Sequence, residues 1–118
     1  MVIDFNNIKE EQIMNFKGGE GELDTRNFID SDNKIMMSRL KPGASSGYHK
    51  HEGNCEVVYI VEGEATFIYD DKEEVVKAGQ VHYCPDGHSH SMINKTDKDL
   101  VYFALVPTLK KQDRKSVV

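Results

Sequence analysis

The chain has 118 residues, a length that suits one domain with a single hydrophobic core. Its 20 acidic residues outnumber its 15 basic residues, and the net charge of −5 disfavours contact with the phosphates of nucleic acid. No apolar run approaches the roughly 20 residues of a membrane-spanning helix, and the N-terminus lacks the basic start and apolar block of a leader peptide. We therefore expect a soluble, cytoplasmic protein that binds neither nucleic acid nor a membrane.

Residues 7–18 (NIKEEQIMNFKG) have the features of a short N-terminal helix. Asn7 can act as the N-cap, acidic residues follow within the first turn, and Gly18 can end the helix. The glycine-rich segment 17–22 (KGGEGE) lacks both the GxxxxGK spacing of a phosphate-binding loop and a strand before it. We therefore interpret segment 17–22 as a plain turn.

From residue 26 onward, strand-length apolar segments alternate with segments rich in Gly, Pro, Asp and Asn, which favour turns. The strand-like segments are RNFI, KIMMSRL, EVVYIV, EATFIY, EEVVKA, QVHYC, HSMIN and LVYFALV. No helical stretch separates them, so the pattern predicts an all-β sandwich or barrel. We expect residues 108–118 to form a loosely ordered charged tail, with a basic interaction arm as the alternative.

Four of the five histidines lie in two short segments. His49 and His51 are two residues apart, so in a strand they share one face and can bind one ion. A turn after His51 can bring Glu56 back toward the same interior as a third ligand. His88 and His90 share a face after the turn PDG, which makes a fourth ligand available.

Two blocks of spaced residues resemble the two signature motifs of the cupin superfamily. The first block reads Gly43, five residues, His49, one residue, His51, four residues, Glu56, six residues, Gly63. The second block reads Gly79, five residues, Pro85, one residue, Gly87, two residues, His90, three residues, Asn94. The 15 residues between the blocks match the short spacing of compact single-domain cupins.

This resemblance implies an all-β cupin fold, a double-stranded β-helix or jelly-roll barrel, with a metal-binding core over about residues 35–107. It also implies that His49, His51, Glu56 and His90 bind one divalent metal inside the barrel. Three imidazoles and one carboxylate suit Fe, Mn, Ni, Co or Zn, and they leave two octahedral positions open for water or substrate. Cupins of this size commonly form homodimers, so we expect a homodimer here.

Several other residues are candidates for contact with a ligand. His88 can act as a general acid or base beside the metal, or it can be a turn histidine at the mouth of the barrel. Tyr83 and Tyr102 can line the pocket and move protons, or they can belong to the core. Arg39 can clamp a substrate carboxylate, although strand alternation from Leu40 favours an outward position.

The two cysteines, Cys55 and Cys84, lack the CxxC or Cys/His context of a reactive thiol. We expect both to be reduced, buried small residues. Gly47 is expected to let the chain turn into the metal-binding strand.

The leading functional hypothesis is a metal-dependent enzyme that acts on a small oxygen-rich metabolite, such as a sugar acid or a dicarboxylate. The resemblance extends to cupin dioxygenases, decarboxylases and sugar isomerases, whereas Glu56 argues against thiol oxidation. The alternative is a non-catalytic module that uses the metal to bind a small molecule, because one fold hosts many functions. A third possibility is a partner-binding protein in which the metal only stiffens the barrel.

Overall fold

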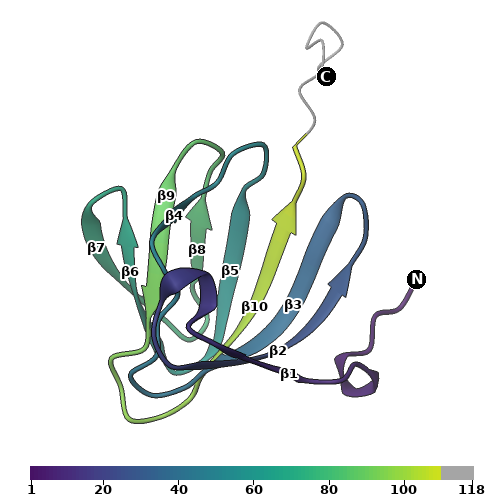
Figure 1. The fold of residues 1–118 in the computed structure, drawn as a ribbon, viewed down its shortest axis with the longest axis horizontal. Coiled ribbons are helices and arrows are strands. Elements are labelled where there is room, and N and C mark those ends of the chain that lie inside the picture. The colour runs from purple at the N-terminus through teal and green to yellow at the C-terminus, as the bar shows by residue number, and fades with distance from the viewer. Residues whose placement is uncertain (110–118) are drawn as a thin grey trace, which may run out of the picture.

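The computed structural model describes residues 1–109, which form ten strands in two antiparallel sheets (Figure 1). The strands are β1 (Glu11–Met14), β2 (Glu22–Ile29), β3 (Asn33–Leu40), β4 (His49–Lys50), β5 (Glu56–Glu62), β6 (Glu64–Tyr69), β7 (Lys72–Lys77), β8 (Val81–Cys84), β9 (Ser89–Ile93) and β10 (Leu100–Pro107). One sheet has the order β1-β2-β3-β10-β5-β8, and the other has the order β4-β9-β6-β7. Of the expected tail, residues 110–118 lie outside the described residues.

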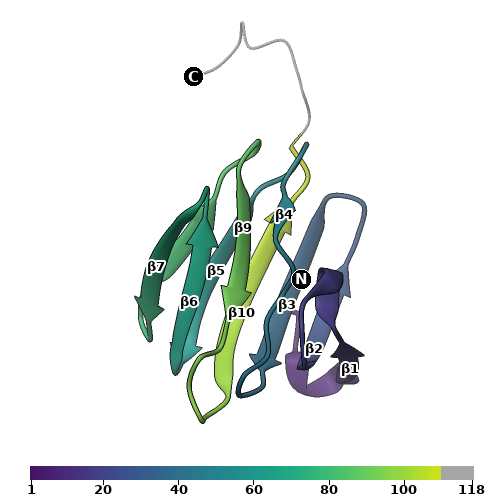
Figure 2. The same ribbon diagram turned by 60° about the vertical axis from the view of Figure 1, so that its left-hand side comes forward.

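The two sheets face each other as a sandwich, and in Figure 2 strands β7, β6, β9 and β4 of the four-stranded sheet lie in front of β5, β10 and β3 of the other sheet. This arrangement confirms the predicted all-β jelly-roll fold. The barrel is open, because over residues 1–109 no ladder joins the edge strands of one sheet to those of the other. β4 is only two residues long and pairs only with β9, so the four-stranded sheet ends there.

The predicted N-terminal helix, by contrast, is wrong. A 3-10 turn at Phe5–Asn7 and another at Phe16–Gly18 flank strand β1, which pairs with β2 from Glu11 to Met14. Asp4, not Asn7, caps the first turn by accepting a hydrogen bond from the backbone of Asn6 at 3.0 Å. The few apolar residues of this segment make a better strand edge than a helix face, because the ladder with β2 satisfies their backbone groups.

The inner face of the six-stranded sheet is layered from one end to the other. Rows of side chains run across β2, β3 and β10, since paired residues on neighbouring strands share a face. Beginning at the end of the sheet where Leu40 lies, the rows are Leu23–Leu40–Leu100, Thr25–Ser38–Tyr102, Asn27–Met36–Ala104 and Ile29–Lys34–Val106. The sheet therefore changes from an apolar layer to a polar one, and a lysine occupies the row nearest the other end.

The N-terminal segment is locked against the chain that leads into β4. The Gly47 amide donates to the Phe16 carbonyl at 3.0 Å, and a side-chain carbon on Gly47 would lie only 1.8 Å from the Lys17 carbonyl oxygen. Gly19 is similarly tight, because such a carbon would lie 2.1 Å from the Ser45 oxygen. Segment 17–22 is thus more than a plain turn: its backbone contacts hold the loop that precedes the first histidine pair.

None of the described helical turns is long or apolar enough to cross a membrane. Thr108 and Leu109, at the start of the expected tail, donate backbone hydrogen bonds to the carbonyls of Asp32 and Gly53.

Candidate metal centre

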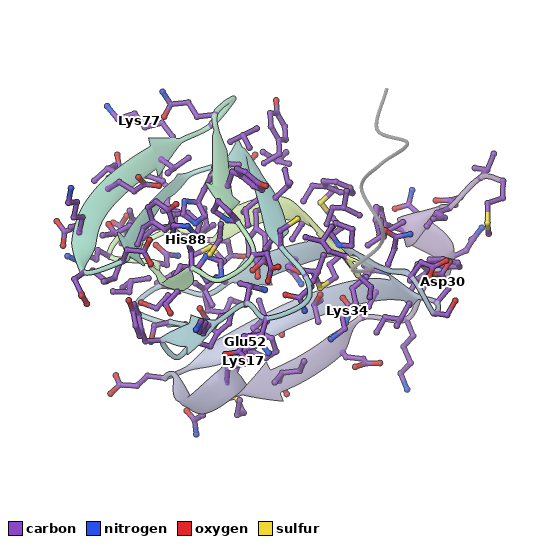
Figure 3. All side chains as sticks on the ribbon, turned by 90° about the horizontal axis from the view of Figure 1, so that it is seen from above. Lys17, Asp30, Lys34, Glu52, Lys77 and His88 are labelled. Carbon is purple, nitrogen blue, oxygen red and sulfur yellow. The ribbon has the colours of Figure 1, made fainter. Side chains whose placement is uncertain are left out.

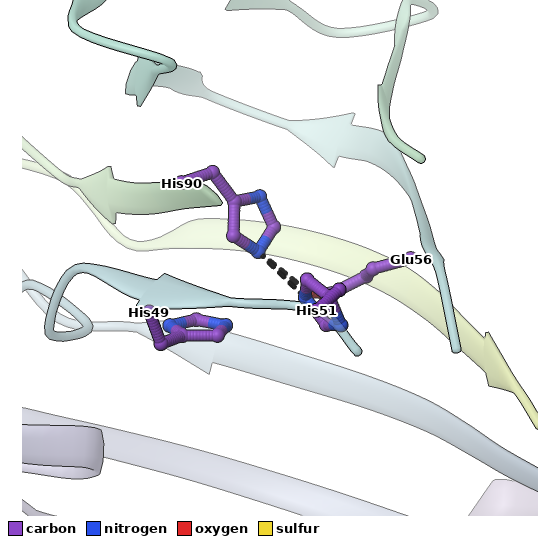
Figure 4. Close-up of side chains that lie close together, drawn as sticks. All are labelled: His49, His51, Glu56 and His90. Atoms are coloured by element: carbon purple, nitrogen blue, oxygen red, sulfur yellow. Dashed lines mark hydrogen bonds and ion pairs between the residues drawn. The ribbon is translucent and has the colours of Figure 1, made fainter. Parts of the chain in front are cut away.

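The structure brings together the four side chains that the motif resemblance named, which are His49, His51, Glu56 and His90. One ligand atom from each lies within 4.8 Å of the others (Figure 4). His49 in β4 is directly opposite His90 in β9, and Glu56 begins β5 in the facing sheet. The centre therefore lies between the two sheets, and its residues could hold one metal ion.

Each histidine is held through its Nδ1 atom. His49 Nδ1 donates to the Gly47 carbonyl at 2.7 Å, and His51 Nδ1 donates to the Asn54 side-chain oxygen at 2.6 Å. His90 Nδ1 lies 3.0 Å from the Nε2 atom of His82. The Nε2 atoms of all three rings are therefore available to a shared ion, as expected where a second group orients each metal-binding imidazole.

The donor set fits a divalent metal. His49 Nε2 is buried and has no hydrogen-bond partner among the described residues, an arrangement that ordinarily costs about 1–3 kcal/mol. His51 Nε2 lies 3.0 Å from His90 Nε2 and 3.2 Å from Glu56 Oε1, so three acceptor atoms converge on one place. A cation would satisfy all of them, and imidazole with carboxylate suits transition metals.

The protonation equilibria of the cluster are coupled to burial and to the Glu56 carboxylate. Burial alone would raise the pKa of Glu56, but in the metal-free protein its contacts with the imidazole rings of His51 and His90 bring it down to about 2. Burial lowers the pKa of His49, whereas the hydrogen bond to Glu56 raises the pKa of His51. At neutral pH the site therefore contains an ionised carboxylate, as metal binding requires.

His82 is a buried neighbour of the centre that the sequence did not single out. Only 1% of His82 is exposed, and its ring stacks on Phe67 with the centroids 3.8 Å apart. Its Nδ1 atom lies 2.6 Å from Glu74 Oε1, and burial lowers its pKa against the opposing effect of Glu74. Alternation with the buried Cys84 could have placed His82 on the inner face, but no local pattern connects it with Glu74.

A cavity of about 230 Å³ adjoins the four candidate ligands. Polar and cationic side chains form part of its wall, including Thr25, Asn27, Ser38, Tyr102, Lys17, Lys34 and Lys50. Figure 3 labels Lys17 and Lys34 in the view from above. The N-terminal segment closes one side of the cavity through Ile13 and Phe16.

The family described as the cupin domain matches residues 36–106, more than half of the chain. The chain belongs to the cupin family. A curated relative, the oxalate-binding protein of Thermotoga maritima, is 37% identical to this cupin over 112 residues, which cover 90% of this chain and 93% of the relative.

Solved structures agree with this assignment. A crystal structure described as a predicted oxalate decarboxylase from Thermotoga maritima has a TM-score of 0.86 and 35% identity, covering 92% of this cupin and 100% of that chain. A sugar phosphate isomerase of the cupin superfamily from Silicibacter pomeroyi has a TM-score of 0.75 and covers 91% of this cupin and 75% of that chain. Its identity is 21%, so it bears on the fold alone.

The three candidate catalytic residues occupy different environments in this cupin. Tyr102 lines the cavity, and burial raises the pKa of its hydroxyl, aided by the Glu56 charge. Tyr83 is 52% exposed and does not line the cavity. His88 lies in the turn before β9, where its Nδ1 atom contacts the Asp70 carboxylate and its ring stacks on Tyr69. Of the three, only Tyr102 lines the cavity.

Arg39 and the cysteines lie away from the cavity. Arg39 points outward and forms an ion pair with Glu10 at 2.8 Å, as alternation favoured. Cys55 and Cys84 are both buried and form no disulfide, in line with the expectation of small buried residues.

Proposed function

We propose that this cupin binds one divalent transition metal, drawn from Fe, Mn, Ni, Co and Zn, and uses it to hold a small carboxylate. The observation that carries the proposal is the convergence of three imidazole Nε2 atoms and the Glu56 carboxylate beside a cavity with a cationic wall. When bound, such a metal acts as a Lewis acid toward a carboxylate or carbonyl oxygen. His49, His51, Glu56 and His90 would hold it.

The wall of the cavity supports a small, oxygen-rich anion as the ligand. Lys17, Lys34 and Lys50 supply positive charge. Thr25 and Ser38 add hydroxyl groups to the same wall, where Thr25 Oγ1 lies 2.7 Å from Ser38 Oγ. The volume of about 230 Å³ has room for roughly eight groups the size of water, at about 30 Å³ each. A dicarboxylate or a sugar acid fits this description, and one relative is named as an oxalate-binding protein.

Turnover of that ligand, by decarboxylase, isomerase or dioxygenase-type chemistry, is a second candidate function. The observation that favours it is the position of Tyr102 in the cavity wall. Its raised pKa keeps the hydroxyl protonated at neutral pH, so Tyr102 can donate a hydrogen bond to a bound carboxylate. Because Tyr83 and His88 lie outside the cavity wall, we place binding first and catalysis second.

Calorimetry with oxalate tests the binding proposal. Metal-loaded protein should bind oxalate, whereas metal-free protein and the His51→Ala variant should not. Equal binding with and without metal would refute it. Carbon NMR of oxalate loss by the wild type and by Tyr102→Phe separates the two functions. If the protein is a catalyst, Tyr102→Phe should bind oxalate as the wild type does but should not turn it over. If it is a binding protein, neither form should turn oxalate over.

We also propose that the protein self-associates through the outer face of the six-stranded sheet. Tyr59 and Val61 on β5, together with Val81 and Tyr83 on β8, are exposed there. The patch extends to β8, an edge strand without a further partner strand in residues 1–109, and a second copy can present the same patch in a symmetric dimer. A 13.4 kDa species in gel filtration would contradict this proposal.

Two free thiols suit a reducing compartment. We accordingly propose a cytoplasmic location.

A further inference from the structure

A chain of three side chains connects the metal centre with β7, the edge strand of the four-stranded sheet. Glu74 on β7 has a side chain that is 45% exposed, and its Oε1 atom lies 2.6 Å from Nδ1 of His82 on β8. His82 Nε2 lies 3.0 Å from Nδ1 of His90 on β9. His82 is not part of the cavity lining, so it acts on a ligand only through His90.

The side chain of His82 also bridges the two sheets. β8 belongs to the six-stranded sheet, whereas β7 and β9 belong to the four-stranded sheet. The His82 side chain therefore reaches across the sandwich to Glu74 and His90. Its ring is stacked on Phe67, with an interplanar angle of 15°, so its orientation is fixed by packing as well as by hydrogen bonds.

The position of each proton follows from the chemistry of Glu74. An ionised carboxylate only accepts, so His82 Nδ1 must donate to Glu74. In neutral His82 the Nε2 atom is then an acceptor, and it receives the hydrogen bond from His90 Nδ1. This arrangement leaves the His90 Nε2 lone pair for a metal. If His82 Nε2 carried the proton instead, His90 Nδ1 would have to accept the hydrogen bond. The neutral His90 ring would then carry its own proton on Nε2, the nitrogen that faces the metal site.

We propose that Glu74 and His82 are positioning residues for the metal centre, and that they hold His90 in the one tautomer and orientation that can bind a metal. This inference rests on the proposed metal site. It assigns a role in metal affinity to two residues outside both the four ligands and the cavity wall.

Metal affinity of full-length variants tests the proposal. His82→Phe keeps a ring on Phe67 but removes the acceptor for His90, and we expect its Co²⁺ affinity to fall about 10–100-fold, as for other groups that orient a ligand. Glu74→Gln retains an oxygen that accepts from His82, so a smaller loss is expected. Glu73→Gln is the matched control: Glu73 is the next residue on β7 and pairs with Lys95 at 3.1 Å. Its affinity should equal that of the wild type.

Two further readouts separate positioning from a loss of fold. Thermal unfolding of the metal-free proteins shows whether each variant is folded, and the visible spectrum of the Co²⁺-loaded protein reports on the ligands themselves. A changed spectrum in Glu74→Gln, with normal unfolding, supports positioning, and this variant carries the test if His82→Phe does not fold. Wild-type affinity and spectrum in folded variants would overturn this inference alone. Failure of the wild type to bind Co²⁺ would overturn the metal site and the inference together.

Discussion

Replacing Gly47 by alanine should damage the metal centre from outside it. The added carbon would lie 1.8 Å from the Lys17 carbonyl oxygen, and real contacts of this kind do not fall below 3.0 Å, so the backbones must separate by at least 1.2 Å. The Gly47 carbonyl accepts the hydrogen bond from His49 Nδ1 at 2.7 Å, so the shift is passed to a candidate ligand. Metal-ligand distances tolerate only about 0.2 Å.

We expect Gly47→Ala to lower the free energy of unfolding of the metal-free protein by about 1–3 kcal/mol, the usual cost of overpacking. Metal affinity should fall at least about tenfold, as when a supporting contact of a ligand is lost. Urea unfolding and a metal competition assay measure the two quantities. Tyr48→Ala is the control, since Tyr48 is the next residue and is 50% exposed. A Gly47→Ala protein with the wild-type unfolding midpoint and metal affinity would refute the reasoning.

Three further predictions concern the ligands and the core. Metal at about 100 times its Kd should stabilise the protein by about 2.7 kcal/mol in thermal unfolding, and His51→Ala should abolish this gain. Metal content should fall as the pH drops through the pKa of His51, which Glu56 raises above the usual 6.5, because a protonated imidazole cannot bind; unchanged content at pH 4.5 would contradict this. Asn94→Ala should cost about 3 kcal/mol in urea unfolding, because the buried Asn94 side chain makes four hydrogen bonds, two of them to the Leu40 and Lys98 carbonyls; Asn6→Ala, at an exposed site, should cost almost nothing.

The strands and the ligand cluster could be predicted because both depend on short-range patterns. Alternation places His49 and His51 on one face. Glu56 and His90 were assigned to the same site through the resemblance of the two motif blocks to those of cupins, and the structure brings all four together. The N-terminal segment was mispredicted because its conformation depends on pairing with β2, which local helix signals do not include. Closure of the barrel likewise depends on how the edge strands meet in space.

The facing of individual side chains was harder to predict. In β8 the buried positions are those of His82 and Cys84, so the aromatic Tyr83 between them faces outward, against the usual preference for an apolar interior. His88 pairs with Asp70, which lies 18 residues away in the chain, and its position depends on the turn after β6. Contacts of this kind arise from the tertiary fold, and the local spacing of residues does not predict them.

The two buried thiols have a consequence for oxidation chemistry. Cys55 precedes Glu56 in the chain, and Cys84 is paired with Glu56 across the β5–β8 ladder, so both lie next to the carboxylate ligand. Burial raises the pKa of both thiols, that of Cys84 to about 12. At pH 7 the Cys84 thiolate is then only about 10⁻⁵ of the total, and the thiolate is the form that binds soft metals and reacts with peroxide. In the metal-free protein both thiols are therefore almost entirely protonated at pH 7, which keeps them slow to oxidise although they flank Glu56.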